Sequence, residues 1–301
     1  MHTHAFLAMG GTVELQLVGT DAGALARVEA LFAAHEQAMS RFRADSELCA
    51  LNASPATPFR ASPLLFDVVS EAAGWACITG GVFDPTIIDA LEANGYDRPF
   101  DQLTPRAAVL PRPHAAAGRW RRIAFDFERE TITLPADVRI DLGGIGKGYT
   151  VDRAIASLGP HANALVNAAG DLYAVGDGPD GDGWYVGVQD PFSPGDDLAV
   201  LNVNDRGVAT SGRIKRHWTA GDARYHHLID ARDGRSSSSD LLTATVVALT
   251  ATQADVLAKT AFLLGSRHGL RMVERFAGAE CIAVTARGEV LMTSGMTEYF
   301  A

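Results

Sequence analysis

Hydrophobic residues along the chain either alternate with polar ones or recur at helical spacing, and these two periods predict its elements. Apolar residues alternate over residues 13–17, which predicts a half-buried strand within residues 6–18. Helical spacing over residues 21–39 predicts an amphipathic helix with Asp21 as its N-cap. Further helices are predicted over residues 45–52, 62–79, 145–158, 252–265 and 266–276, and further strands over residues 123–127, 131–134, 138–140, 164–167, 172–175, 184–188, 198–203, 207–211, 242–249, 281–285 and 290–293. Strands and helices interleave without a regular strand–helix–strand rhythm, which is typical of the α+β class.

Capping residues and prolines mark several boundaries between these elements. Thr252 and Asp255 have the spacing of a capping box, with Asp in place of Glu. Asp84, in the turn over residues 80–86, is interpreted first as the cap of a short helix. Residues 97–118 carry prolines and no apolar period, so they predict a long surface loop.

The most informative stretch is Asp141-Leu142-Gly143-Gly144-Ile145-Gly146-Lys147-Gly148, where a predicted strand meets a predicted helix. A helix start leaves backbone N–H groups without partners, so it suits an anion such as a phosphate, and Lys147 adds a positive charge nearby. The spacing matches neither the dinucleotide-binding pattern nor the P-loop. A tight turn in which the glycines only permit close packing is an equally open interpretation.

Composition narrows the class of protein. The chain has 301 residues, of which 47% are apolar and 21% are charged, as is typical of a globular protein. Its net charge of −10 argues against a nucleic-acid partner bound through phosphates. Its 3 cysteines are too few for a disulfide framework or a zinc site, and we expect Cys49 and Cys77 in the core. The sequence shows neither a membrane-spanning run nor a secretory signal pattern, which predicts a cytoplasmic protein.

Few side chains combine in a way that predicts chemistry. His227, with Asp230 three residues further on, is a possible base beside an orienting carboxylate, although a lone histidine is more often structural. His226 is adjacent, so only one of the two histidines can face a given site. Asp255 and Lys259 lie four residues apart on a predicted helix, where both an ordinary ion pair and an ion site are open interpretations. The local spacing of the sequence contains no cluster of metal ligands.

Nine short motifs follow one another between residues 9 and 255. They are Met9-Gly10-Gly11-Thr12, Ser40-Arg41-Phe42, Ser46-Glu47-Leu48 with Leu51-Asn52, Gly81-Val82-Phe83-Asp84-Pro85, residues 141–148, Asn167-Ala168-Ala169-Gly170-Asp171, Thr210-Ser211-Gly212, His227-Leu228-Ile229-Asp230 and Ala254-Asp255. Each motif alone is weakly specific. In this order they resemble the ApbE family, whose members are FAD:protein FMN transferases.

The resemblance implies an α+β fold of mixed or antiparallel sheets flanked by helices, with a cleft that holds FAD. It implies a single domain over residues 1–301, in which two closely packed lobes are possible. FMN would pass from FAD through its phosphate to a threonine hydroxyl of a flavoprotein acceptor, with release of AMP. A magnesium ion would bridge the diphosphate of FAD, because in-line attack on phosphorus requires neutralised charge.

The resemblance also assigns roles to individual residues. His227 corresponds to the histidine that activates the incoming hydroxyl, and Asp230 supports it. The metal would be held by the carbonyl of Gly146, by Asp255 and by the residue at position 259. The residues implied to line the FAD cleft are Met9, Asp84, Gly143, Gly144, Lys147, Asn167, Asp171, Thr210 and Ser211.

Several positions depart from the family's pattern. Lys259 stands where the family has a threonine ligand, and a protonated lysine cannot bind a metal, so its ammonium is expected in the metal's place beside Asp255. Thr260 lies one residue later, about 100° further round the helix. Asp233 stands where the family has a threonine, and Ala169 where it has a glycine.

Three functions follow as alternatives. The favoured one is FMN transfer from FAD to a protein acceptor. The second is an FAD pyrophosphatase that uses water as the acceptor and gives FMN and AMP. The third is a non-catalytic FAD-binding protein, which would retain FAD and would not depend on His227.

Overall fold

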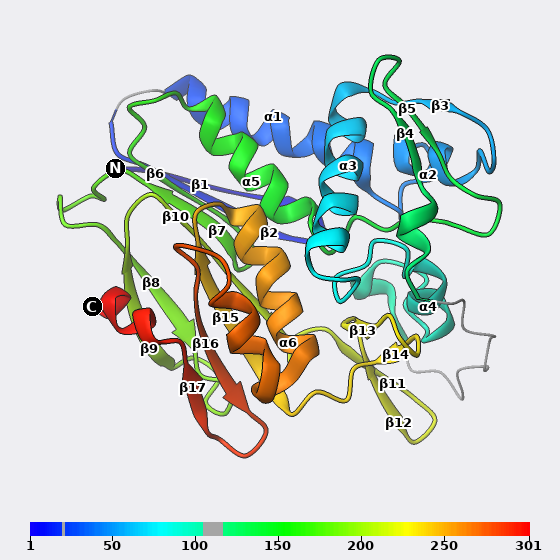
Figure 1. Ribbon diagram of the computed structural model, residues 1–301. Helices are drawn as coiled ribbons and strands as arrows, with labels where there is room; N and C mark the ends of the chain where they lie inside the picture. The colour runs from blue at the N-terminus through cyan, green and yellow to red at the C-terminus, as the bar shows by residue number, and fades with distance from the viewer. Residues whose placement is uncertain (20–21, 105–116) are drawn as a thin grey trace. The chain divides into compact units, whose positions relative to one another are not determined.

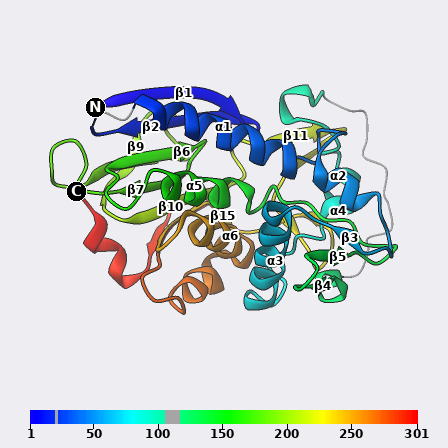
Figure 2. The same cartoon turned by 90° about the horizontal axis from the view of Figure 1, so that it is seen from above.

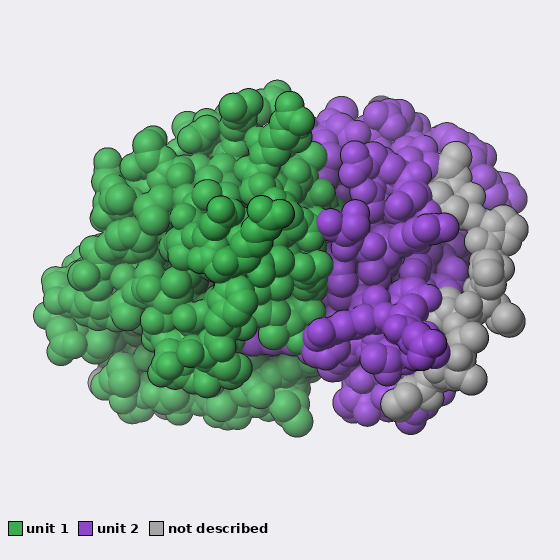
Figure 3. Space-filling model, turned by 90° about the horizontal axis from the view of Figure 1, so that it is seen from below, with its two compact units in different colours: residues 1–33, 147–214, 239–301 green, residues 34–146, 215–238 purple. Residues whose placement is uncertain are grey.

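The computed structural model describes residues 1–19, 22–104 and 117–301, and it has the α+β architecture that the sequence predicts (Figure 1). The chain divides into two compact units, coloured separately in Figure 3. Unit 1 comprises residues 1–33, 147–214 and 239–301, and unit 2 comprises residues 34–146 and 215–238. The predicted N-cap Asp21 and residues 105–116 of the predicted loop lie outside the described residues.

Unit 1 is built on an eight-stranded sheet in which every neighbouring pair of strands is antiparallel. The strands, in their order across the sheet, are β1 (His2–Ala8), β2 (Gly11–Leu17), β6 (Ala164–Ala168), β7 (Asp171–Val175), β10 (Arg206–Gly212), β15 (Leu241–Ala248), β16 (Glu280–Thr285) and β17 (Val290–Met292). Long-range pairings such as β2 with β6 bring distant parts of the sequence to one side of the sheet.

The first strand prediction is right in its alternation and wrong in its extent. Residues 6–8 belong to β1 and residues 11–17 to β2, and the two strands are joined at Met9 and Gly10. The φ angles of these two residues are 51° and 72°, as a two-residue hairpin turn with positive φ at both positions requires. The predicted alternation in β2 is confirmed by three buried residues, Val13, Leu15 and Leu17.

The two faces of this sheet bury different clusters, because neighbouring residues of a strand point to opposite sides. Val166 packs with residues of α1 (Ala22–Met39) and α5 (Gly146–Ser157). Its neighbour Leu165 packs with β8 (Trp184–Gln189), β9 (Asp197–Val203) and η3 (Ser294–Tyr299). Strands β8 and β9 pair with each other as a separate antiparallel hairpin. Helices therefore cover one face of the sheet and the hairpin covers the other. Figures 1 and 2 show α5 between α1 and α6 (Ala251–Val273).

Helix α6 begins and bends at residues that the sequence predicts only in part. Its N-cap is Thr250, whose hydroxyl accepts the N–H of Gln253 at 3.0 Å, so the predicted cap at Thr252 is wrong. Thr252 instead donates its own N–H and hydroxyl to Asp152, at 2.9 and 2.5 Å. The predicted break at Gly265 is confirmed, since its φ of 71° and ψ of −178° interrupt the helix.

Unit 2 combines short helices with small sheets. Its elements are α2 (Glu47–Asn52), α3 (Pro63–Ile78), α4 (Ile88–Ala93), η1 (Phe100–Gln102), η2 (Arg119–Arg122), the sheet of β3 (Phe59–Arg60), β5 (Thr131–Thr133) and β4 (Ala124–Asp126), and the pairs β11 (His217–Ala220) with β12 (Ala223–His226) and β13 (Ile229–Asp230) with β14 (Arg235–Ser236). Serine caps start two of the helices: Ser46 accepts the N–H of Cys49 at 3.0 Å, and Ser62 accepts that of Leu65 at 3.2 Å.

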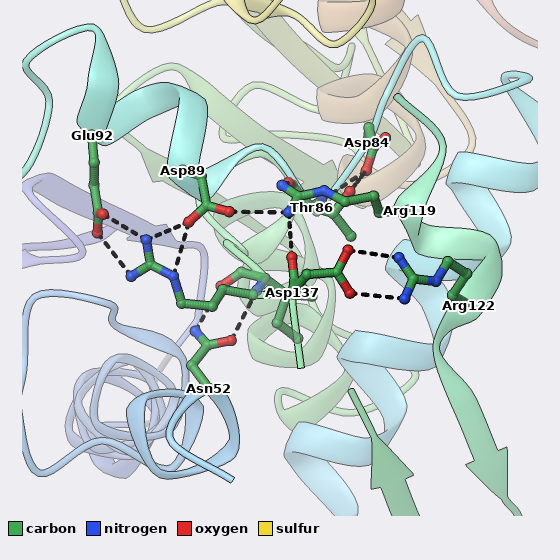
Figure 4. Close-up of polar contacts among 10 residues, drawn as sticks. Asn52, Asp84, Thr86, Asp89, Glu92, Arg119, Arg122 and Asp137 are labelled. Carbon is green, nitrogen blue, oxygen red and sulfur yellow. Dashed lines mark hydrogen bonds and ion pairs between the residues drawn. The ribbon is translucent and has the colours of Figure 1, made fainter. Parts of the chain in front are cut away.

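Residues 138–140 form no strand, contrary to the sequence prediction. Ile140 donates its N–H to the Asn52 carbonyl oxygen Oδ1 at 2.8 Å and accepts from the Asn52 amide at 2.9 Å. Figure 4 labels Asn52 and draws these hydrogen bonds as dashed lines. A side-chain amide thus satisfies the backbone groups that a neighbouring strand would otherwise bind.

An ion-pair network fixes the chain just before the glycine-rich turn (Figure 4). The buried Arg119 guanidinium donates to Asp89 at 3.1 Å and to the carbonyl of Thr86 at 2.8 Å. Asp89 also pairs with Arg139, which binds Glu92 at 2.6 Å. Because the members come from distant parts of unit 2, the network joins α4, η2 and the segment that leads into the turn.

Candidate active site

The glycine-rich turn is anchored by an aspartate for which the sequence predicts no role. Asp141 accepts the N–H of Gly143 at 2.9 Å, and its own N–H donates to the carbonyl of Pro85 at 2.8 Å. Its second carboxylate oxygen pairs with the guanidinium of Arg41 at 2.8 Å, and both side chains are buried. A buried charge needs a partner, so Arg41 and Asp141 hold the turn before α5 as a unit.

At least one glycine of this turn is needed for close packing. None of Gly143, Gly144, Gly146 and Gly148 has a positive φ, so the turn does not require glycine for its backbone angles. A Cβ at Gly148 would lie 2.6 Å from the carbonyl oxygen of Ala251. Gly148 therefore lets the start of α5 approach the start of α6.

Four charged side chains of unit 1 form what we call the lysine–aspartate cluster: Lys147, Asp171, Asp255 and Lys259. Lys147, at the start of α5, forms an ion pair with Asp171 at the start of β7. Lys259 forms an ion pair with Asp255 one turn earlier on α6. The two aspartate side chains are only 4% and 1% exposed, so this is a buried site rather than a surface pair.

All three other members of the cluster affect the pKa of the Asp255 carboxyl. Burial raises the pKa of its carboxyl, Asp171 raises it further, and the ammonium groups of Lys259 and Lys147 lower it. Asp255 also accepts the N–H of Gly148 in the first turn of α5, at 3.3 Å. The Asp255 carboxylate thus occupies part of the electropositive start of α5, which the sequence predicts as a site for an anion.

The residues of the cluster do not fit a magnesium ion. A divalent ion of this kind needs several oxygen ligands, whereas each cluster carboxylate already binds an ammonium. Thr260 is buried and donates its hydroxyl to the carbonyl of Val256 at 2.8 Å, so it does not replace the missing threonine ligand. Among the residues that the structure describes, no group of three or more His, Cys, Asp or Glu side chains is arranged to hold a metal.

His227 and Asp230 lie in unit 2, beyond the end of β12 and in β13. Nδ1 of His227 lies 3.3 Å from the carbonyl oxygen of Arg216, which can only accept, so Nδ1 carries the proton of the neutral ring. Nε2 is then the nitrogen that can take up a proton. Asp230 accepts from the guanidinium of Arg232 at 2.5 Å and from the Arg232 backbone N–H at 2.9 Å.

The adjacent His226 has a different environment, as the alternation of a strand predicts. Its ring is buried, and Nε2 lies 3.0 Å from the carbonyl oxygen of Ser237. The two histidines therefore contact different backbone carbonyls, at residues 216 and 237. Of the two, His227 is the more accessible for chemistry.

Asp84 binds both within its own turn and to Gly118, and it does not cap α4. Its Oδ1 accepts the N–H of Thr86 at 2.8 Å and the Thr86 hydroxyl at 2.5 Å, and Oδ2 accepts the N–H of Gly118 at 3.3 Å. The N-cap residue of α4, Ile87, makes no side-chain capping bond. Figure 4 shows Asp84 beside Thr86 and Arg119, so the interpretation as a helix cap is wrong in detail.

The remaining sequence-predicted residues lie in unit 1, on or beside its sheet. Met9 occupies the β1–β2 turn and packs on the cluster that contains Val13. The Asn167 carbonyl oxygen Oδ1 accepts the N–H of Gly170 at 2.8 Å, which shapes the turn that presents Asp171. Thr210 is exposed and Ser211 is buried, since successive residues of β10 point to opposite faces. A ligand on one face of the sheet meets only one of these two hydroxyls.

Comparisons with known proteins agree on one family. The family model described as "ApbE family" matches residues 9–283. An FAD:protein FMN transferase of Treponema pallidum is 29% identical over 91% of this chain and 80% of its own length. One from Klebsiella pneumoniae is 25% identical over 98% of this chain and 92% of its own length.

Solved structures share the fold over nearly the whole chain. The crystal structure of the ApbE protein of Thermotoga maritima superposes with a TM-score of 0.90 at 24% identity, covering 100% of this chain and 99% of that one. The flavin transferase ApbE of Vibrio cholerae gives a TM-score of 0.85 at 22% identity, covering 99% and 98%. At these identities the structures establish the fold alone, and the family match covers most of the sequence. The chain therefore belongs to the ApbE family.

Proposed function

We propose that this protein is an FAD:protein FMN transferase. The observation that carries the proposal is the family match over residues 9–283, which takes in all nine motifs of the sequence and residues of both units. The relatives that match over most of their own length are FAD:protein FMN transferases. We propose accordingly that both units work as one FAD-binding domain.

The chemistry assigns a role to His227. A hydroxyl of the acceptor attacks the phosphorus of the FMN half of FAD, and the bond between that phosphorus and the bridging oxygen breaks. His227 accepts the hydroxyl proton at Nε2, because the carbonyl of Arg216 keeps the ring proton on Nδ1. AMP leaves, and FMN stays on the acceptor as a phosphoester. Asp230, paired with Arg232, supports the segment that carries the histidine.

Three finer expectations belong to this proposal. The acceptor residue is a threonine of a flavoprotein, as the family resemblance implies. The family resemblance also implies a magnesium ion, but the residues of the lysine–aspartate cluster do not fit one. A cytoplasmic location remains a prediction that cell fractionation tests. No helix in the described part of the chain is long and apolar enough to cross a membrane.

The test is AMP release from FAD by the purified protein, with and without a threonine-bearing acceptor domain. AMP that appears only with the acceptor, together with the mass of FMN on the acceptor, supports the transferase. AMP without the acceptor supports the pyrophosphatase. Retained FAD with no AMP under either condition contradicts both and supports a binding protein.

A further inference from the structure

The chain contains few lysines. Lysine and arginine together number 26, but only three of them are lysines: Lys147, Lys215 and Lys259. Two of the three lie in the lysine–aspartate cluster, each in an ion pair with a largely buried aspartate. Lysine is a compact point charge, whereas arginine is a planar fork. The cluster therefore contains the residue type that most closely resembles a bound cation.

The charges of the cluster balance without a metal ion. Two ammonium groups face two carboxylates, so two positive and two negative charges sum to zero. A divalent ion beside Asp255 would have to displace Lys259, whose side chain is 14% exposed, or leave its ammonium buried without its partner. An ammonium group and a magnesium ion would compete here for the same carboxylate.

We infer that Lys259 takes the place of a divalent cation, and that Lys259 and Lys147 bind the diphosphate of FAD without metal. An ammonium group has three donors, so Lys259 can hold Asp255 and a phosphate oxygen at once. The inference rests on the proposed function, because FAD is the substrate of that reaction. It predicts a family member whose FAD binding does not depend on magnesium.

The first experiment measures metal binding in the absence of FAD. Mn²⁺ is titrated into the full chain, and free Mn²⁺ is followed by electron paramagnetic resonance. The wild type is expected to show no saturable site, and Lys259→Thr is expected to gain one, because the threonine hydroxyl and the released Asp255 supply oxygen ligands. A saturable site in the wild type that Asp255→Asn removes would overturn the inference.

The second experiment measures FAD affinity from flavin fluorescence, in excess EDTA and in excess MgCl₂. The wild-type dissociation constant is expected to agree in the two buffers within about twofold, whereas that of Lys259→Thr should fall by about tenfold or more when magnesium is added. Lys259→Met removes the charge and supplies no ligand, so its weakened binding should not recover with magnesium. Lys215→Thr, at an exposed position, is the matched control and should behave as the wild type.

The outcomes separate this inference from the proposed function. If wild-type FAD binding weakens about tenfold in EDTA, the inference is wrong and the transferase proposal stands. If FAD binds in neither buffer, the proposed function fails, and the Mn²⁺ titration still decides whether Lys259 excludes a metal. The wild-type measurements need no variant, so a poorly folding Lys259→Thr does not prevent a decision.

Discussion

At two positions of the proposed site, the partner of a single side chain limits what that side chain can do. At position 259 an ammonium stands beside a buried carboxylate, where a neutral oxygen ligand would leave room for a metal ion. At position 227 a backbone carbonyl fixes the ring tautomer, and with it the nitrogen that can act as a base. Neither effect follows from residue type alone, because each depends on the partner that the fold brings within reach.

His227→Asn is expected to lower the rate of FMN transfer by roughly 10²- to 10⁴-fold, because it removes the proton acceptor. Asparagine can still donate to the Arg216 carbonyl, so the local structure is kept. FAD affinity should stay unchanged, which binding measured alongside AMP release will check. His161→Asn, at an exposed histidine, is the control. A transfer rate equal to that of the wild type would contradict the role of His227.

The cysteines are expected to differ sharply in reactivity. Cys77 is exposed on α3, contrary to the sequence expectation, because its helix buries the face of Ala76 instead. Cys281 is buried in β16, and burial raises the pKa of its thiol to about 12. A thiol reagent at pH 8 should therefore label Cys77 in the folded protein and label Cys281 only after unfolding. Peptide mapping of the labelled protein measures this, and rapid labelling of Cys281 would contradict its burial.

At the scale of elements, α5 and α6 cap each other. Asp152 of α5 accepts the N–H groups of Ala251 and Thr252 at the start of α6, at 2.7 and 2.9 Å. Asp255 of α6 accepts the N–H of Gly148 at the start of α5. Carboxylates at helix starts satisfy donors that the helix leaves unpaired. The exchange explains why the capping-box spacing at Thr252 and Asp255 misled the sequence prediction.

Asp152 is expected to make the free energy of unfolding decrease with rising pH. Burial raises the pKa of its carboxyl in the folded state, although the hydrogen bonds from Thr252 and Ala251 oppose the rise. Between the unfolded and the raised folded pKa, the folded state binds more protons, so the free energy of unfolding falls as pH rises. Asp152→Asn should reduce this dependence in the mildly acidic range.

Urea unfolding of the wild type and of Asp152→Asn at a series of pH values measures the difference between them. The difference isolates Asp152 from the other carboxylates of the chain, because those are common to both proteins. A wild-type free energy of unfolding that rises with pH more steeply than that of the variant would contradict the sign.

At the scale of the whole molecule, the net charge affects the binding of an anionic ligand, and FAD binding affects the stability of the fold. The chain carries −10 overall, whereas the lysine–aspartate cluster at the proposed diphosphate site has no net charge, so the cluster does not add to the global repulsion of an anion. FAD that binds only the folded chain stabilises it, by about 2.7 kcal/mol at a hundred times its dissociation constant.

FAD is therefore expected to raise the melting temperature by a few degrees in EDTA, and MgCl₂ alone is expected to leave it unchanged. Riboflavin, which lacks the diphosphate, is the matched control and should give a smaller shift. Differential scanning fluorimetry with an extrinsic dye is confounded by flavin emission, so circular dichroism is the suitable readout. No shift with FAD would contradict binding to the folded chain.

Much of the fold follows from the sequence, because periodicity and capping are local. The alternation in β2 and the break at Gly265 each depend on a few neighbouring residues. The predicted strand over residues 138–140 failed because Asn52, far away in sequence, satisfies its backbone. The ordered motifs also indicated the family, which the comparisons confirm.

Only the tertiary structure decided which charged groups meet. The sequence placed Asp255 and Lys259 one helical turn apart, but it could not show that Lys147 and Asp171 join them in a buried cluster with no net charge. It likewise could not show that Arg41 anchors Asp141. Helical and strand periods are set by neighbours along the chain, whereas the energy of a charge is set by its burial and by partners that folding brings from a distance.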